Sequence, residues 1–365
     1  MDLLARDLDG AGPLRTVPPS VVIRRWSGRA DPPSATALGR KTGARLAVFG
    51  QLVATRGDSV RLTATLFDVG TGRPLGEVEF RDLSVSMDRL ADSLAIALLQ
   101  ALGRSRPIGA VRSTAFRSTS LPALKAFLQG EQFFRRTAWD SALAYYGRAV
   151  SADSGFALAW RRMSTVLGWQ VIGGDSLSGV YALRAAALNR GLPPRESLLV
   201  TAESLTAALF SGSADTAWRA HQARLFATLG EATRRYPEDP EVWYELGDAR
   251  FHFRQVGRTG PEQVLEPFDH AIALDSAFRE SYLHPVGLAL QLGRPELAQR
   301  YLAGYLGHNP GADDKGHAQG LRLVDQLLAH PAARPPELDR LIDTSSAKVL
   351  FDAIIAMSHW PDSLE

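Results

Sequence analysis

Histidine has the widest chemical range of the residues in this sequence, because imidazole can bind metals or transfer protons near neutral pH. All eight histidines lie after residue 220: His221, His252, His270, His284, His308, His317, His330 and His359. No pair of histidines has a metal-ligand spacing, and the chain contains no HExxH motif. We therefore interpret them as surface or helix-packing residues and predict no metal site.

Other catalytic motifs are absent or incomplete. The chain has no GxSxG, no kinase HRD or DFG, and no Cys, which excludes thiol catalysis and disulfides. Ser345 and Lys348 form an S-x-x-K that lacks its companion motifs, and Asp313 and Asp314 stand in a predicted turn. The sequence therefore predicts a non-enzymatic protein without a cofactor, with an unrecognised hydrolase as the alternative.

Composition excludes several further classes. Of 365 residues, 45% are apolar and 22% are charged, and the formal net charge is only +2, which argues against disorder and against a dedicated nucleic-acid binder. No apolar run reaches the 18 residues of a membrane span, and the first residues do not resemble a signal peptide. The compartment stays open: cytoplasmic, or extracytoplasmic if a parent protein has an upstream membrane span.

Residues 1–106 have the pattern of an α+β domain. Asp31 is a suitable N-cap for a short helix that Gly43 ends. Three strand-like runs follow, RLAVFGQLVAT, VRLTATLFDV and PLGEVEFRD, joined by glycine-containing turns. The segment after Met87 has apolar residues at helical spacing, including Leu90, Leu94 and Leu98. We predict helices packed on a mixed or antiparallel sheet.

This order resembles the FlgO-like or TolB amino-terminal α/β domain of bacterial envelope and signalling proteins. The segments that carry the resemblance are TGARLAVFGQLV, VRLTATLFDVGTGRPLG and the helix after Met87. That family usually begins with a strand before its first helix. The resemblance therefore implies that this strand is missing at the start of the chain.

Residues 107–119 are rich in Ser and Arg and predict a linker, and residues 120–360 then show a helical repeat. Gly130 on one predicted helix is followed twelve residues later by Ala142 on the next, with Tyr146 and Ala149 one and two turns further on. Small and aromatic residues in this order resemble the tetratricopeptide repeat. The segment YPEDPEVWYELGDARF repeats the pattern, with Trp243, Leu246 and Gly247 in register.

Less regular segments complete the second region. Residues 193–236 predict two degenerate helices, and LRLVDQLLAH, PELDRLID and AKVLFDAIIAM predict further helices near the end. The chain stops at HWPDSLE, where another repeat is expected. We predict that this region is an all-α solenoid, because a single helical pair cannot bury its apolar face and must stack on neighbours.

The resemblance to tetratricopeptide repeats implies a groove lined by the first helix of each pair. Phe134 is preferred over Phe133, which the pattern places in the core, and the position of Phe251 stays open between core and groove. The predicted partner-binding residues are Phe127, Glu131, Phe134, Arg135, Arg161, Tyr244, Asp248 and His252. Aromatic and Arg side chains are the types that anchor interfaces.

The combination of these two regions resembles the part that accompanies kinase, adenylate cyclase or winged-helix domains in bacterial signalling proteins. It implies a sensory scaffold that binds a protein or peptide in the groove, with no nucleic-acid partner. An envelope or lipoprotein-assembly scaffold is the alternative.

Overall fold

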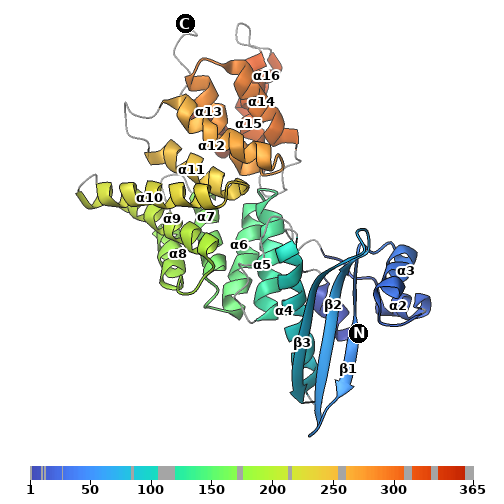
Figure 1. Ribbon diagram of the computed structural model, residues 1–365. Coiled ribbons are helices and arrows are strands. Elements are labelled where there is room, and N and C mark those ends of the chain that lie inside the picture. The colour runs from blue at the N-terminus through green and yellow to red at the C-terminus, as the bar shows by residue number, and fades with distance from the viewer. Residues whose placement is uncertain are drawn as a thin grey trace. The chain divides into compact units, whose positions relative to one another are not determined.

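The chain divides into two compact units, residues 1–132 with 144–159 and residues 133–143 with 160–365. The structure is a computed structural model, and Figure 1 shows its elements. The predicted domain boundaries at residues 106 and 120 stay a prediction, and the predicted linker lies outside the described residues. The structure describes residues 2–9, 11, 14–26, 28–83, 86–105, 120–170, 176–212, 216–253, 260–307, 315–329 and 336–357.

The first unit contains the predicted three-stranded meander. Strands β1 (Leu46–Ala54), β2 (Ser59–Asp68) and β3 (Arg73–Leu83) pair antiparallel in the order β1-β2-β3. Both hairpin turns contain a glycine at positive φ, Gly57 at 74° and Gly72 at 68°, a conformation that glycine adopts without steric cost. The described part of the sheet is thus antiparallel throughout, without the parallel pairing of a mixed sheet.

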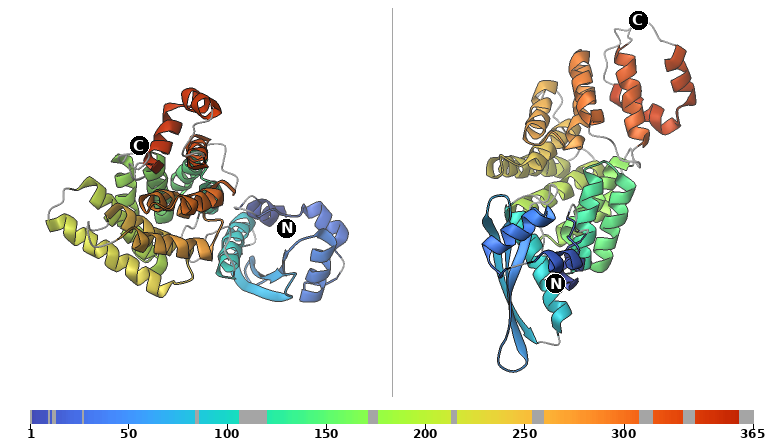
Figure 2. Two further views of the ribbon diagram at one scale, coloured as in Figure 1. Left: turned by 90° about the horizontal axis from the view of Figure 1, so that it is seen from above. Right: turned by 90° about the vertical axis from the view of Figure 1, so that its right-hand side faces the viewer.

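Helices pack around this sheet as the sequence predicts. Helix α4 (Met87–Ser105) runs along one face of the sheet (Figure 2), with Leu90, Leu94 and Leu98 buried. Helix α3 (Pro32–Thr42) begins where Asp31 accepts a hydrogen bond from the Ser34 backbone N–H at 2.8 Å. The first unit also contains the short helices α1 (Asp2–Leu8) and α2 (Pro19–Arg25). The predicted α+β class is confirmed.

Helices account for the regular structure of the rest of the described chain. Between residues 176 and 344 successive helices pack on one another, and the 3-10 helix η3 (Arg279–Tyr282) comes directly before the helix that begins at Leu283. The segments predicted as degenerate or terminal helices are all helical. The helices are α5 Leu121–Phe134, α6 Trp139–Ala152, α7 Ala157–Gln170, α8 Ser176–Ala187, α9 Pro194–Ser211, α10 Thr216–Arg235, α11 Pro240–Phe253, α12 Pro261–Leu274, α13 Leu283–Gln291, α14 Pro295–Gly307, α15 Lys315–Ala329, α16 Pro336–Thr344 and α17 Ala347–Met357.

Glycine-to-aromatic contacts hold two of the helix pairs together. A Cβ atom on Gly130 would lie 2.5 Å from the Tyr146 ring, and one on Gly247 would lie 2.9 Å from the Phe268 ring. Each glycine therefore lets an aromatic ring of the next helix approach the backbone directly. This is the packing of a small residue against a large one that the repeat pattern predicts. It fixes which face of the first helix packs against the second helix of the pair.

Within the described residues, no helix is both long enough and apolar enough to cross a membrane.

Candidate functional site

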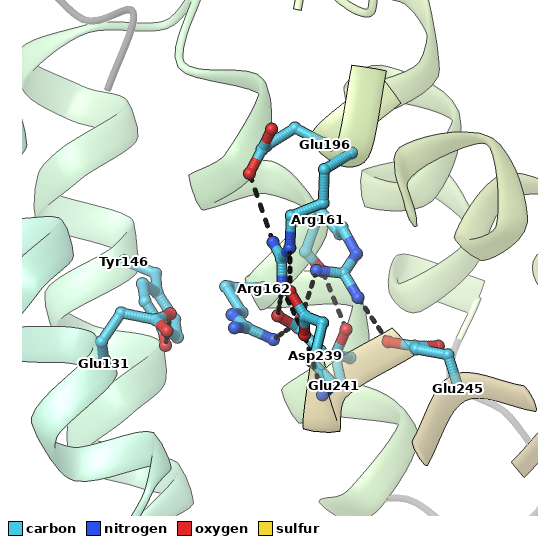
Figure 3. A network of polar contacts seen from close by, with 10 residues as sticks. Glu131, Tyr146, Arg161, Arg162, Glu196, Asp239, Glu241 and Glu245 are labelled. Carbon is cyan, nitrogen blue, oxygen red and sulfur yellow. Dashed lines mark hydrogen bonds and ion pairs between the residues drawn. The ribbon is translucent and has the colours of Figure 1, made fainter. Parts of the chain in front are cut away.

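Charged side chains from α7, α9 and α11 meet in one connected cluster of the second unit, which we call the charged centre (Figure 3). Most of its members are largely buried, although the helices that carry them are far apart in the sequence. Its members are Arg161, Arg162, Arg195, Glu196, Glu203, Asp239, Glu241 and Glu245.

Arg161 links α7 to α11. Its side chain is 4% exposed, and its Nη1 donates to Glu241 Oε1 at 2.8 Å while its Nη2 contacts Glu245 Oε1. Arg162, the next residue, also reaches Glu241 Oε1, at 2.9 Å. One turn of α7 is therefore held against the first turns of α11 by charge-assisted hydrogen bonds.

Arg195 at the start of α9 completes the pairing. Its Nε donates to Asp239 Oδ2 at 2.6 Å, and its Nη2 donates to Glu241 Oε2 at 2.7 Å. A third contact joins Nη1 to the carboxylate of Glu196 at 3.2 Å. Burial acts to raise the pKa of Glu241, but the three guanidinium groups outweigh it and hold that pKa well below its usual range.

Carboxyl groups outnumber guanidinium groups in the charged centre. The three arginines face five acidic side chains. Of these, Glu203 and Glu245 are the two whose negative charge the arginines balance least. Burial raises the pKa of Glu203, and burial together with the neighbouring carboxylates raises that of Glu245 to about 8. Since like charges in a buried site repel, the unliganded centre keeps a proton on Glu245 at neutral pH, and a bound cation would take the place of that proton.

A second group of polar side chains, which we call the histidine cluster, lies on the same helix α11. Asp248 and His252 are one turn apart, and His284 joins them from α13. Burial acts to raise the pKa of Asp248, but the charge of His252 and a hydrogen bond with His284 lower it. One carboxylate and two imidazoles are the ligand types of divalent transition metals.

Five of the eight predicted partner-binding residues are buried, so their expected exposure is not found. Phe127 packs against Tyr146 and Phe156, and Tyr244 packs against Phe268 and Phe278. The exposed fractions of the whole residues are 2% for Phe127, 1% for Glu131, 3% for Phe134, 3% for Arg161 and 4% for Tyr244.

The two aromatic residues Phe127 and Tyr244 are buried because each packs against the second helix of its own pair and against a Phe in the turn that follows it. The preference for Phe134 over Phe133 is reversed, because Phe134 is the more buried ring, between Trp139 and the guanidinium of Arg162. Arg161 is enclosed by the charged centre. Phe251 is half-buried and stacks on His284 with ring centroids 4.0 Å apart.

The remaining three predicted residues keep partial exposure. Arg135 donates to Asp275 at 2.8 Å, and both side chains are at least one-fifth exposed. The side chains of Asp248 and His252 are 21% and 32% exposed. The structure brings these last two together, whereas Arg135 lies in a separate ion pair.

Sequence reasoning missed most of the charged centre. Arg195 lies in residues 193–236, where the sequence does not match the repeat pattern. It could therefore not be given a position within a repeat, in the core or in the groove. Glu241 lies on the first helix of its pair, which the sequence analysis expects to line the groove, so a signal for it was present. His284 could not be grouped with Asp248 and His252 because 32 residues separate His252 from His284 along the chain.

Comparisons with known proteins place this chain beside repeat proteins of low similarity. TTC0263, a thermophilic TPR protein of Thermus thermophilus, is 17% identical, with 57% of this chain and 98% of that chain covered and a TM-score of 0.40. YrrB, a TPR protein with an unusual peptide-binding site, is 14% identical, with 52% and 88% covered and a TM-score of 0.26. No protein-family model matches the chain, and no curated protein matches it. The helix packing described above, and not this likeness, therefore defines the fold.

Proposed function

We propose that this protein is a non-catalytic interaction scaffold that binds a protein or peptide partner at the charged centre, through a basic side chain of that partner. The observation that carries the proposal is the excess of acidic over basic side chains in the centre. A guanidinium or ammonium group would supply the missing positive charge and form charge-assisted hydrogen bonds with the carboxylates.

A buried carboxyl group beside the centre supports the same proposal. Glu280, in η3, is 0% exposed, and neither of its carboxyl oxygens has a hydrogen-bond partner on another described residue. Burial raises its pKa to about 7, although its own backbone N–H and the charges of Arg135, Arg162 and Arg279 act to lower it. A buried polar group without a partner is costly. Glu280 is too deeply buried to contact a ligand, but it adds one more acidic group beside the centre.

Access to the centre is through its edge on α11. The side chains of Glu241 and Glu245 are each 12% exposed, and those of Asp248 and His252 are more exposed still. We therefore retain Asp248 and His252 as partner-binding residues and add Glu245. The predicted residues Phe127, Glu131, Phe134 and Tyr244 act instead by positioning the helices.

A peptide binding assay tests this function. We would screen a random peptide library with a fixed central Arg against the same library with citrulline, a neutral analogue of Arg, at that position. The Arg library should contain peptides that bind, and Glu245→Gln should weaken them by about tenfold or more, because it removes one partner of a buried charge pair.

The matched control is Glu266→Gln, on α12, whose side chain is 68% exposed. This variant should bind the selected peptides like the unmodified protein. Equal binding of the Arg and citrulline libraries, or unchanged binding by Glu245→Gln, would contradict the proposal.

We further propose that the scaffold serves a bacterial signalling protein, which rests on the resemblance of residues 1–106 to FlgO-like and TolB amino-terminal domains. The antiparallel meander covered by α4 is compatible with that resemblance. The coding sequence upstream of this segment tests the context. A kinase, cyclase or winged-helix domain there supports it, and a lipoprotein signal supports the envelope scaffold instead.

A further inference from the structure

Two imidazoles and one carboxylate converge at one end of α11. His284 Nε2 lies 3.0 Å from Asp248 Oδ1, and His252 Nε2 lies 3.6 Å from the same oxygen. One ligand atom from each of the three residues lies within 4.8 Å of the other two. Each histidine therefore points its own Nε2 atom at the same carboxylate oxygen of Asp248.

These separations suit one metal ion placed between the three atoms. With metal–ligand bonds of about 2.0–2.1 Å, the ligand atoms of a tetrahedral zinc site are about 3.3 Å apart. The distances from Asp248 to the two imidazole nitrogens lie on either side of that value, so small side-chain rotations would complete the geometry. A hydrogen bond alone accounts for His284, but it does not account for His252, whose nitrogen is beyond hydrogen-bond range of the carboxylate.

Aromatic rings fix the orientation of both ligating histidines. The ring of His284 stacks on Phe251, at 4.0 Å and 18°, and on Trp169, at 5.3 Å and 24°. His252 contacts the ring of Phe210 edge-on at 5.3 Å. Side chains held by packing lose little further conformational freedom when an ion binds, which favours binding.

The surroundings are negative and remain reachable from solvent. The carboxyl groups of Glu203 and Glu245 lie close enough to Asp248 for its charge to raise their pKa values. The side chain of His252 is 32% exposed and that of His284 is 15% exposed. An ion can therefore enter, and three protein ligands would leave a fourth position open for water or for a partner group.

We propose that Asp248, His252 and His284 bind one divalent transition-metal ion of the zinc class, with one coordination position open. Two imidazole nitrogens and one carboxylate oxygen are a ligand set that zinc accepts in proteins. The site does not depend on partner binding, because all three ligands belong to this chain.

The test is titration of the tag-free, chelator-treated full chain with Zn²⁺ by calorimetry. We expect one tight site per chain, and His252→Ala and His284→Asn should each weaken it by about 100-fold or more, since even outer-shell changes at metal sites cost 10–100-fold. Substitution with Co²⁺ should give the intense visible absorption of a four-coordinate ion.

The matched control is His270→Ala, a neighbouring histidine that contacts Trp243 and lies outside the cluster. It should leave Zn²⁺ affinity unchanged, and circular dichroism should report the same helix content in all variants. His252 is exposed enough that its replacement should not unfold the protein. The proposal is overturned if the unmodified chain binds no Zn²⁺ tightly, or if His252→Ala and His270→Ala bind it equally.

Discussion

Helices α5 and α11 use the same repeat positions for different purposes. In both, a glycine meets an aromatic ring of the next helix, and an acidic residue follows that glycine directly: Glu131 after Gly130, and Asp248 after Gly247. Glu131 is 1% exposed and accepts a hydrogen bond from Tyr146 Oη at 2.6 Å. Asp248 is more exposed and faces two histidines.

A single hydroxyl group accounts for much of the difference. The ring that meets Gly130 is Tyr146, whose hydroxyl satisfies the neighbouring carboxylate within the helix pair. The ring that meets Gly247 is Phe268, which has no hydroxyl, so Asp248 finds its partners on α13 and one turn along α11. The same repeat geometry therefore leaves Glu131 with a purely structural hydrogen bond in one pair, whereas in the other it places Asp248 beside two histidines, where it can act as a metal ligand.

The largest effect should come from breaking the charged centre, which links α11 to α7 and α9. Arg161→Met removes the guanidinium that pairs with Glu245 and one of the three that pair with Glu241, and loss of one member of a buried ion pair costs about 3–5 kcal/mol. Urea unfolding should show this loss of free energy. A cost near zero would mean that the centre contributes no specific pairing.

Tyr146→Phe makes the α5 pair resemble the α11 pair. It removes the hydrogen bond to the buried Glu131 and should lower the free energy of unfolding by about 1–3 kcal/mol. Differential scanning calorimetry measures the change. The double variant Tyr146→Phe with Glu131→Leu should recover part of it, and equal losses in the single and double variants would contradict the explanation.

The smallest expected effect is a change in pH dependence. Glu245 has its pKa raised from 4.5 to about 8 in the folded protein, chiefly by burial. The folded chain then keeps a proton that the unfolded chain releases, so this group's contribution to stability is present at low pH and is lost as pH rises through about 8.

Glu245→Gln removes this titration. The variant should therefore lose less stability than the unmodified protein as the pH rises from 4.5 to about 8. The free energy of unfolding at a series of pH values, compared with that of Glu266→Gln, measures the effect. An unchanged slope in Glu245→Gln would show that Glu245 is ionised in the folded protein at neutral pH.

Local sequence patterns predicted the fold well, because its elements are specified by nearby residues. The cap at Asp31, the glycine turns of the meander and the contact between Gly130 and Tyr146 all follow from short-range spacing. These features depend on side-chain volume and on local backbone preference, and both follow from the residue types at nearby positions in the sequence.

The candidate site was predicted only in part, because it depends on how far the helices approach one another. The repeat pattern identified Asp248 and His252 but expected an open groove. The contact of Arg161 with Glu241, 80 residues away, depends on how successive pairs stack, and no local pattern encodes that. The same stacking brings His284 to Asp248.

The most direct test of the account compares two conservative neutralisations, Glu131→Gln and Asp248→Asn, in parallel measurements of unfolding free energy and Zn²⁺ affinity. Glu131→Gln should reduce stability and leave Zn²⁺ affinity unchanged, whereas Asp248→Asn should weaken Zn²⁺ binding and leave stability nearly unchanged. If Asp248→Asn lowers stability as Glu131→Gln does and leaves Zn²⁺ binding intact, the two acids play the same structural role and the account is contradicted.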